Sequence, residues 1–191
     1  MSEHLPLNIS PLPVKLRIGD YLLLDDAGAF DGYRKTELIE EEVLFMNAQH
    51  RPHVRIKSRL HVLLAEALRS HGGGLEAIVE GSIAIPPINV PGPDIVVTSE
   101  AEGKGLVPLE SVHLIVEVAD ATLKNDLTVK AAVHARHGVP EYWVVDVEGR
   151  AIHQMSAPDG EEYRERRKIG LGRRIEAVTL TGLAVATEGV G

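Results

Sequence analysis

The sequence predicts a single α/β domain in which a mixed central sheet is flanked by helices. Apolar side chains recur at helical spacing in residues 53–70, and residues 94–146 follow the order strand, strand, helix, strand. Further strand candidates follow in residues 151–186. The chain has 191 residues, which is enough for one sizeable domain and short for two. These observations favour one sheet with helices packed on it.

The first part of the chain is predicted to hold an arm, a short helix and a hairpin. Residues 1–13 contain three prolines and no apolar period, which indicates a flexible arm before a domain that spans residues 14–191. Residues 18–24 are predicted to form a short helix, and residues 25–32 a turn-rich loop. Residues 36–46 hold two apolar runs around an acidic turn, which favours a β-hairpin.

The central part of the chain is predicted to alternate helices and strands. The Arg51–Pro52 pair breaks the chain after the hairpin, and the helix that follows ends at a run of three glycines. A second helix carries Asp126 and Thr128 in its first turn and ends at Gly138, before Pro140. The predicted helices span residues 53–70 and 125–137, and the predicted strands span residues 76–85, 94–98, 112–118 and 141–146.

The last part of the chain is predicted to form a closing β-meander. Its strands span residues 151–155, 162–169 and 175–186, and Asp159–Gly160 form the turn between the first two. The basic side chains in this part are Arg164, Arg166, Arg167, Lys168, Arg173 and Arg174. Glutamates are interleaved with these basic residues. The segment is therefore as typical of an ordinary charged sheet surface as of a surface that binds a nucleic-acid backbone.

Composition limits the classes of protein to which the chain can belong. Apolar residues make up 44% and charged residues 25% of the chain, which is typical of a protein with an ordinary buried core. The absence of cysteine excludes thiolate metal sites, thiol nucleophiles and a disulfide framework. The N-terminus lacks a signal-peptide pattern, and no apolar run approaches the roughly 18–20 residues of a membrane helix. A cytoplasmic protein without membrane contact is therefore expected.

The net charge of −8 bears on the partners of the chain. Proteins that bind DNA without sequence preference usually present a large basic surface, and this chain as a whole is acidic. A nucleic-acid partner would therefore require a local cationic stripe, or a bound metal ion, to overcome the acidic background.

Two acidic side chains and one basic side chain lie where the predicted fold would bring them together. Asp94 opens a strand directly after Pro93, and Glu117 lies inside an apolar strand, where an unpaired carboxylate is costly to bury. If the strands are neighbours, the carboxylates repel each other unless they are protonated or share a cation such as Mg²⁺ or Mn²⁺. Lys130 lies on the helix that follows, so its ammonium group can reach the same pocket.

Each of these residues also has a simpler interpretation. Asp94 alone is typical of a turn after proline, and Glu117 alone could pair with an arginine in the core. Lys130 alone would be a solvated helix residue, and Lys124 is an equally near competitor for its place. The ordered set of three favours a catalytic site.

Several other polar side chains are expected to lie at the surface. His53, Lys57 and His61 share one helix face, on which Lys57 and His61 are predicted to be solvated. His134 and His137 have no third ligand at zinc-binding spacing, so they are expected at the surface near a helix C-terminus.

Four segments then carry a resemblance to a known family. They are TELIEEEV from Thr36, a helix led by His53, PGPDIVV, and LIVEVADATLKNDLTVKAAVHARHGVPEYWVVD. In this order they resemble the PD-(D/E)XK nuclease superfamily and, more closely, its Uma-type family of bacterial restriction-endonuclease-like proteins. The resemblance runs from about Thr36 to Met155, and its last segment is the most specific, because it joins the strand glutamate, the lysine helix and the GVPEYW strand.

The resemblance implies roles for individual residues. Asp94 matches the aspartate of the PD motif and Glu117 the acidic residue of the (D/E)XK motif, so both would be metal ligands together with the backbone carbonyl of Val118. Ala119 stands where the motif lysine is expected. In Uma-type proteins this lysine lies on the following helix, where Lys130 matches it. Lys130 would place or deprotonate a water molecule, and acting as a base would require a lowered pKa.

Two further residues match the family pattern. Glu42 matches the glutamate of the segment ELI-x-x-E, and His53 matches the histidine that leads the helix, so both are implied to line the same catalytic cleft. Family members often carry Asp-Gly where this chain has Glu40–Glu41, so the hairpin turn departs from the pattern.

The implied fold is restriction-endonuclease-like, and the implied activity is hydrolysis of DNA phosphodiester bonds with Mg²⁺ or Mn²⁺. A homodimer is expected, because two paired sites can address two strands. Two alternatives stay open. One is a catalytically inactive binding or regulatory module with the same fold, which the acidic charge and the displaced lysine favour. The other is a metal hydrolase that acts on a small phosphoester.

Overall fold

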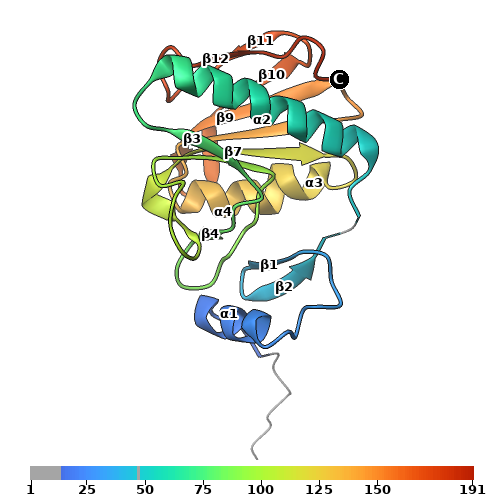
Figure 1. Ribbon diagram of the computed structural model, residues 1–191, viewed down its shortest axis with the longest axis vertical. Helices are drawn as coiled ribbons and strands as arrows, with labels where there is room; N and C mark the ends of the chain where they lie inside the picture. The colour runs from blue at the N-terminus through green and yellow to red at the C-terminus, as the bar shows by residue number, and fades with distance from the viewer. Residues whose placement is uncertain (1–13, 47) are drawn as a thin grey trace, which may run out of the picture.

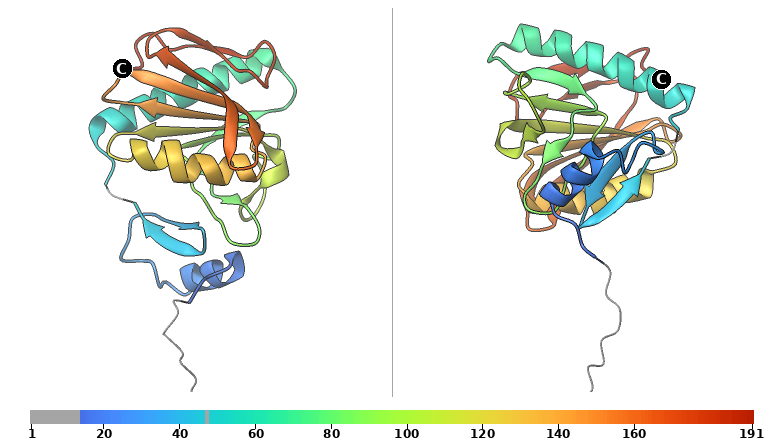
Figure 2. Two further views of the ribbon diagram at one scale, coloured as in Figure 1. Left: turned by 180° about the vertical axis from the view of Figure 1, so that it is seen from behind. Right: turned by 60° about the horizontal axis from the view of Figure 1, so that its bottom comes forward.

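The computed structural model describes residues 14–46 and 48–191, and the arm predicted at residues 1–13 lies outside the described residues. A six-stranded sheet with the order β10-β9-β8-β7-β5-β3 forms the middle layer, between α2 and α4 (Figures 1 and 2). Its strands are β3 (Glu76–Val79), β5 (Ile95–Thr98), β7 (Val112–Ala119), β8 (Glu141–Asp146), β9 (Ala151–Asp159) and β10 (Glu162–Gly170). The predicted mixed sheet with flanking helices is confirmed.

The sheet is mixed because one of its strand pairs is parallel. β7 and β8 run parallel, and the other neighbours in the sheet are antiparallel. A parallel pair needs a crossover connection, and the helical segment at residues 123–136 supplies it. This segment therefore packs back over the sheet, as the sequence predicts.

Alternation along β7 assigns its side chains to two hydrophobic cores. Leu114, Val116 and Val118 belong to the core beneath α2, whereas Ile115 belongs to the core beneath α4. Helix α2 (Arg51–His71) contributes Ile56, Leu60, Leu64 and Leu68 to the first core. Because Glu117 has the parity of Ile115, its side chain points to the α4 face.

Helix α2 begins earlier than predicted. Arg51 and Pro52 form its first turn, where the missing N–H of proline costs no hydrogen bond, so the predicted break at this pair is wrong. The helix ends at His71, and Gly72 closes it with a φ of 78° and an N–H that donates to the Leu68 carbonyl. Its N-terminus thus lies next to residue 50, near the pocket described below.

The second predicted helix contains a π-helical turn. Its three parts are α3 (Leu123–Asn125), the π turn η2 (Asp126–Lys130) and α4 (Ala131–Arg136). A π turn inside a helix is uncommon and occurs frequently at functional sites. Here both Asp126 and Lys130 are buried, and both line one pocket.

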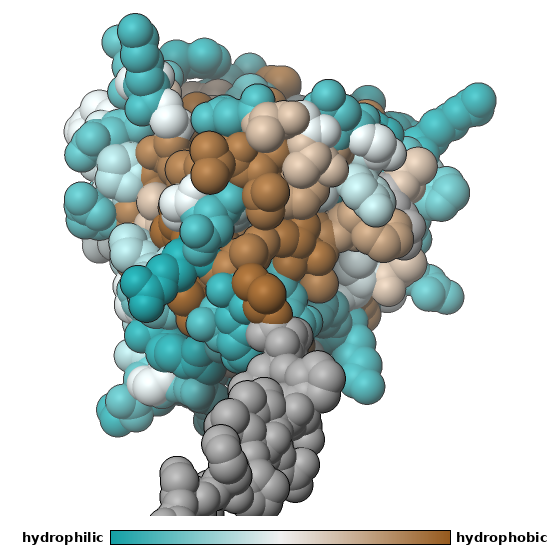
Figure 3. All heavy atoms as spheres, turned by 90° about the horizontal axis from the view of Figure 1, so that it is seen from below, coloured by the Kyte–Doolittle hydropathy of each residue, from teal (hydrophilic) through white to brown (hydrophobic). Residues whose placement is uncertain are grey.

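The N-terminal part forms a small unit below the main sheet (Figure 1). It consists of α1 (Ile18–Asp26) and the predicted hairpin, β1 (Thr36–Ile39) and β2 (Glu42–Phe45), which is confirmed. Glu40 and Glu41 form the turn with φ values of 50° and 69°, the conformation that a two-residue hairpin turn requires and that Asp-Gly adopts more easily. Seen from below, apolar side chains gather on this face of the molecule (Figure 3).

Three predicted β segments differ in the structure. β3 stops at Val79, where Glu80 has a φ of 56°, and β4 (Ile83–Ala84) pairs instead with β6 (Val107–Pro108), which the short 3₁₀ turn η1 (Leu109–Ser111) follows. The β9–β10 turn is shifted by one residue, because Asp159 pairs with Glu162. The last predicted strand is two strands, β11 (Arg174–Glu176) and β12 (Ala184–Ala186), in a separate sheet. No helix in the described part of the chain combines the length and apolar character needed to span a bilayer.

Candidate active site

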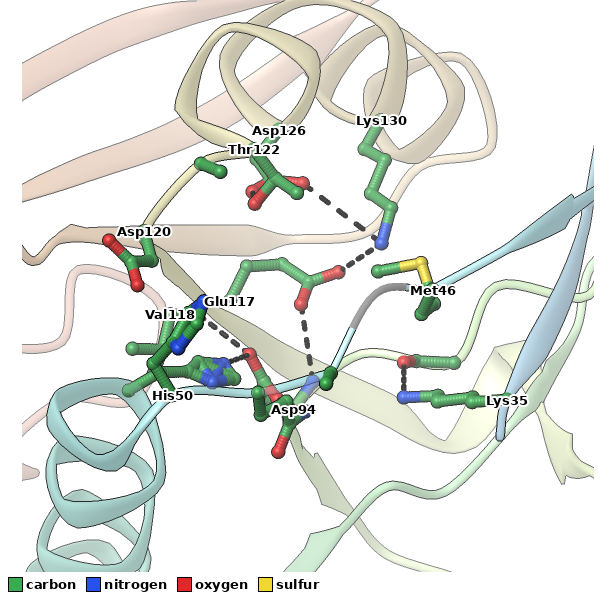
Figure 4. Close-up of a pocket in the computed structure, with 15 residues that line it drawn as sticks. Lys35, Met46, His50, Asp94, Glu117, Val118, Asp120, Thr122, Asp126 and Lys130 are labelled. Carbon is green, nitrogen blue, oxygen red and sulfur yellow. Dashed lines mark hydrogen bonds and ion pairs between the residues drawn. The ribbon is translucent and has the colours of Figure 1, made fainter. Parts of the chain in front are cut away.

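A pocket of about 380 Å³ opens where β7 extends beyond its neighbour β5 (Figure 4). β5 begins at Ile95, which pairs with Val116, so Glu117 and Val118 have no β5 partner. Asp94, the residue just before β5, lies beside them instead and accepts a hydrogen bond from the Val118 N–H. The lining of the pocket includes His53, Asp94, Glu117, Val118, Asp126 and Lys130.

The two carboxylates of the predicted motif meet in this pocket. The Asp94 N–H donates to Oε2 of Glu117 at 3.2 Å, and the Val118 N–H donates to Oδ2 of Asp94 at 2.9 Å. Both residues are only 5% exposed. The carboxylates of adjoining strands therefore share one site, largely shielded from water.

Lys130 reaches the same carboxylates from the opposite wall (Figure 4). Its Nζ lies 2.8 Å from Oε1 of Glu117, 3.1 Å from Oε1 of Glu37 and 4.0 Å from Oδ1 of Asp126. It reaches Glu117 because that side chain points to the face that α4 covers. Lys124 is exposed and does not line the pocket, so the geometry selects Lys130 over Lys124.

Lys130 carries its positive charge in the pocket. Burial alone would lower its pKa, but the negative charges of Glu117, Glu37 and Asp126 outweigh burial and raise the pKa above its ordinary value. A general base at neutral pH must give up its proton readily. These surroundings favour the protonated form of Lys130, which is compatible with the placing of water or charge.

Asp94 is surrounded by polar groups from α2 and the segment before it. His53 Nε2 lies 3.0 Å from Oδ2 of Asp94, and the Gln49 amide donates to Oδ1 at 3.3 Å. Lys57 was predicted to be solvated, yet it is only 7% exposed, and its Nζ lies 2.6 Å from Glu80 and 3.5 Å from Asp94. The N-terminal turn of α2 thus forms one wall of the site.

The charges of the pair Asp94 and Glu117 are unequally stabilised. Burial, followed by the nearby charge of Glu117, raises the pKa of Asp94 to about 6. Burial acts on Glu117 in the same direction, but Lys130 outweighs it and holds the pKa of Glu117 below its ordinary value. Burial and then Lys57 lower the pKa of His53, so its ring is neutral at physiological pH.

Glu42 does not join this site. Its side chain is exposed at the start of β2, outside the lining of the pocket, so the expectation that Glu42 lines the cleft is wrong. The glutamate of the same hairpin that contacts Lys130 is Glu37, which is 0% exposed and also accepts from the Gly92 N–H at 2.9 Å. Glu37 lies in the apolar strand TELI, as Glu117 lies in its apolar strand, and in both cases the sequence indicates a buried carboxylate that needs a partner.

Asp126 is a second residue that sequence reasoning missed. It was predicted only as part of the first helical turn, but it is 2% exposed and lies between Thr122, whose hydroxyl is 2.6 Å away, and Lys130. Asp126 lies four residues before Lys130, and this spacing in a helix places two side chains next to each other, so the sequence could have indicated their contact. Burial, with the charge of Glu117, raises the pKa of Asp126 to about 7.

The raised pKa of Asp126 predicts a pH-dependent loss of stability. A carboxyl group with a higher pKa in the folded state stabilises it at low pH, and this contribution is lost as pH rises through about 7. Asp126→Asn keeps an acceptor for Thr122 without the charge, so the metal-free variant should be more stable than wild type by roughly 2–4 kcal/mol at about pH 8.

Urea unfolding at acidic and mildly alkaline pH checks this prediction. The advantage of Asp126→Asn should shrink on acidification, and the exposed Asp25→Asn should match wild type throughout. If Asp126→Asn is less stable than wild type at alkaline pH, the prediction that ionised Asp126 destabilises the folded state is wrong.

His134 was expected at the surface but is completely buried beneath the pocket. Its ring packs edge-on against Tyr142, with 4.9 Å between the centroids. Burial lowers the pKa of His134 to about 3, so it is a neutral core residue at physiological pH. His137, nearer the end of the helix, is half-buried.

The donor set fits a hard divalent cation. Residues 14–46 and 48–191 hold no metal-binding group of three or more His, Cys, Asp or Glu side chains, but the expected set needs only two carboxylates and one carbonyl. The Ala119 carbonyl faces Val147, so the N–H and carbonyl of Val118 point the other way, towards Asp94. The four carboxyl groups of Asp94, Glu117, Glu37 and Asp126 outnumber the two ammonium groups of Lys130 and Lys57, so a further cation would relieve their repulsion.

Comparison with known proteins agrees with the motif-based resemblance. Residues 19–188 match the Uma2 family, whose description is “Putative restriction endonuclease”. The fold is similar to a crystal structure described as “a putative nuclease belonging to DUF820”, from Anabaena variabilis ATCC 29413. The TM-score is 0.69 at 15% identity, over 93% of this chain and 97% of that chain, which shows a shared fold. No curated protein matches the chain. Because the family match spans most of its length, this protein belongs to the Uma2 family.

Proposed function

We propose that this protein is a metal-dependent endonuclease that hydrolyses phosphodiester bonds in DNA. The observation that carries the proposal is the meeting of Asp94, Glu117 and Lys130, from three separate elements, in one buried pocket. Ionised groups are costly to bury, and groups with perturbed pKa values concentrate at functional sites. Membership of the family whose description is “Putative restriction endonuclease” supports the same function.

In this proposal Asp94, Glu117 and the carbonyl of Val118 would hold a Mg²⁺ or Mn²⁺ ion. When bound, the ion would polarise the scissile phosphate and lower the pKa of a water ligand. His53, which contacts Asp94 at 3.0 Å, would keep that carboxylate oriented toward the ion.

Lys130 supplies a fixed positive charge rather than a base. Its ammonium group stays protonated beside Glu117 and Glu37, so it can stabilise the negative charge that develops on the phosphate during cleavage. Glu37 and Asp126 act through Lys130 as positioning residues, because they approach it from β1 and from the π turn. The site is therefore organised before substrate arrives.

The proposal extends to a domain that spans residues 14–191, to a cytoplasmic location, where DNA is the available substrate, and to a homodimer whose two sites address two strands.

Cleavage assays on plasmid and single-stranded DNA test the proposed function. Wild type should cut in the presence of Mg²⁺ or Mn²⁺ and stop when EDTA is added, and Asp94→Asn should be inactive. Asp159→Asn, at an exposed position of the β9 end, should cut like wild type. If wild type cuts neither DNA with either ion, the proposed endonuclease function is wrong, and a catalytically inactive binding module is favoured instead. Hydrolysis of a phosphomonoester without any cutting of DNA would indicate a small phosphoester as substrate.

A further inference from the structure

A second hollow lies beside the active-site pocket. It has a volume of about 170 Å³ and is lined by Arg34, Lys35, Met46, Gln49, Glu80 and Ser82. Lys35, Met46 and Gln49 also line the larger pocket, so the two hollows adjoin each other. The two hollows together are called the groove here; Asp94 and Glu117 line one of them, Arg34 lines the other, and Lys35 lines both.

Two basic side chains of this groove have no carboxylate partner in the described part of the chain. Arg34 is exposed and Lys35 half-buried, and within the described ranges neither has a carboxylate within 4.0 Å. Lys15 and Arg136, by comparison, form ion pairs with Glu41 and Glu40. In a chain of net charge −8, these two positive charges remain available to a ligand.

Lys35 is held next to the active site. Its ammonium group donates to the carbonyl of Gly92, two residues before Asp94 (Figure 4). A Cβ at Gly92 would lie 2.9 Å from Cε of Lys35, so the side chain packs directly on the glycine. The charge of Lys35 is thus fixed at the junction of the two hollows, and Arg34 precedes it in the chain.

We propose that Arg34 and Lys35 form a subsite that binds the DNA backbone phosphate next to the one that is cleaved. This inference rests on the proposed function. Each strand of DNA carries one phosphate per about 3.4 Å of helix axis, so a strand with one phosphate at the carboxylates places another along the groove. Contacts to phosphate position the strand, and the planar guanidinium of arginine can grip a phosphate with two hydrogen bonds.

The positive charges of the subsite also reduce the electrostatic repulsion between the protein and a DNA strand. The carboxylates of the site repel the phosphate backbone, and a cationic rim beside them offsets this repulsion where the strand enters. The basic residues of β10 lie farther from the carboxylates. β10 is the edge strand and β9 and β8 separate it from β7, so its side chains lie roughly 14 Å from the site across the sheet.

Binding of a fluorescent oligonucleotide, measured by anisotropy without metal over a range of KCl concentrations, tests the subsite. Arg34→Gln should weaken binding about tenfold and lower the number of counterions released, obtained from the dependence of affinity on KCl, by about one. The double variant Arg34→Gln/Lys35→Gln should lower that number by up to about two. The matched control is Arg69→Gln, which is exposed at the other end of α2, about 24 Å from His53, and should leave binding unchanged.

The outcomes separate this inference from the proposed function. If wild type binds and cuts but Arg34→Gln keeps its affinity and salt dependence, the subsite is wrong and the nuclease stands. A loss found instead in Arg167→Gln/Lys168→Gln also overturns the subsite, because the strand then runs over β10. If binding depends on Arg34 while no metal supports cutting, the subsite stands and the nuclease falls. A wild type that neither binds nor cuts overturns both.

Discussion

Replacement of Lys130 by methionine is expected to lower the free energy of unfolding by about 3–5 kcal/mol at about pH 8. Methionine has a similar length, so the change removes the charge and little of the packing. Glu37, which is 0% exposed, and Glu117 would then lie buried without their shared cation. Breaking a buried ion pair by removing one partner is costly, because the remaining charge has lost both water and its counter-ion.

The dependence on pH distinguishes this cause from a packing defect. Without Lys130 the carboxylates can regain neutrality by binding a proton, so the deficit should shrink as pH falls and grow as pH rises. Urea unfolding followed by the fluorescence of Trp143 measures it. The exposed Lys124→Met should match wild type, and Lys130→Met with Glu37→Gln should recover part of the loss. An equal deficit at acidic and alkaline pH would refute the electrostatic cause.

The substitution Glu117→Gln is expected to abolish the stabilisation that Mn²⁺ gives to wild type. A ligand at 100 times its dissociation constant stabilises a protein by about 2.7 kcal/mol, and this increment requires an intact site. Glutamine can still accept from the Asp94 N–H, but it removes the negative charge that a cation needs. Cleavage should fall by a factor of about 10³ or more, because a bound ion contributes several kcal/mol of charge stabilisation.

Thermal unfolding with and without Mn²⁺, together with cleavage rates, checks this prediction. Glu42→Gln is the matched control, since Glu42 is the exposed glutamate of the hairpin and lies outside the pocket. It should retain both the metal-induced shift in melting temperature and the activity. If Glu117→Gln is stabilised by Mn²⁺ as much as wild type, Glu117 is not a metal ligand.

The position of the candidate site could be predicted because its residues break local patterns. Glu117 interrupts an apolar strand and Asp94 opens a short one, so sequence alone indicated two carboxylates that need a partner. The strands of the main sheet were predictable for a related reason, since alternating or continuous apolar runs mark surfaces that must be buried. The start of α2 was mistaken, because proline both breaks helices and favours their first turn.

The amino-acid order by itself indicated the α/β class and the pairing of Asp94 with Glu117, because these follow from periodicity and from the cost of an isolated charge. The family was indicated by the resemblance of four sequence segments to its motifs. Only the tertiary structure decided that Glu37, not Glu42, reaches Lys130, and that Asp126 joins the pocket through a π turn. It also decided the charge of Lys130. A pKa depends on which groups surround the side chain and how much water remains, and these are set by elements far apart in the chain.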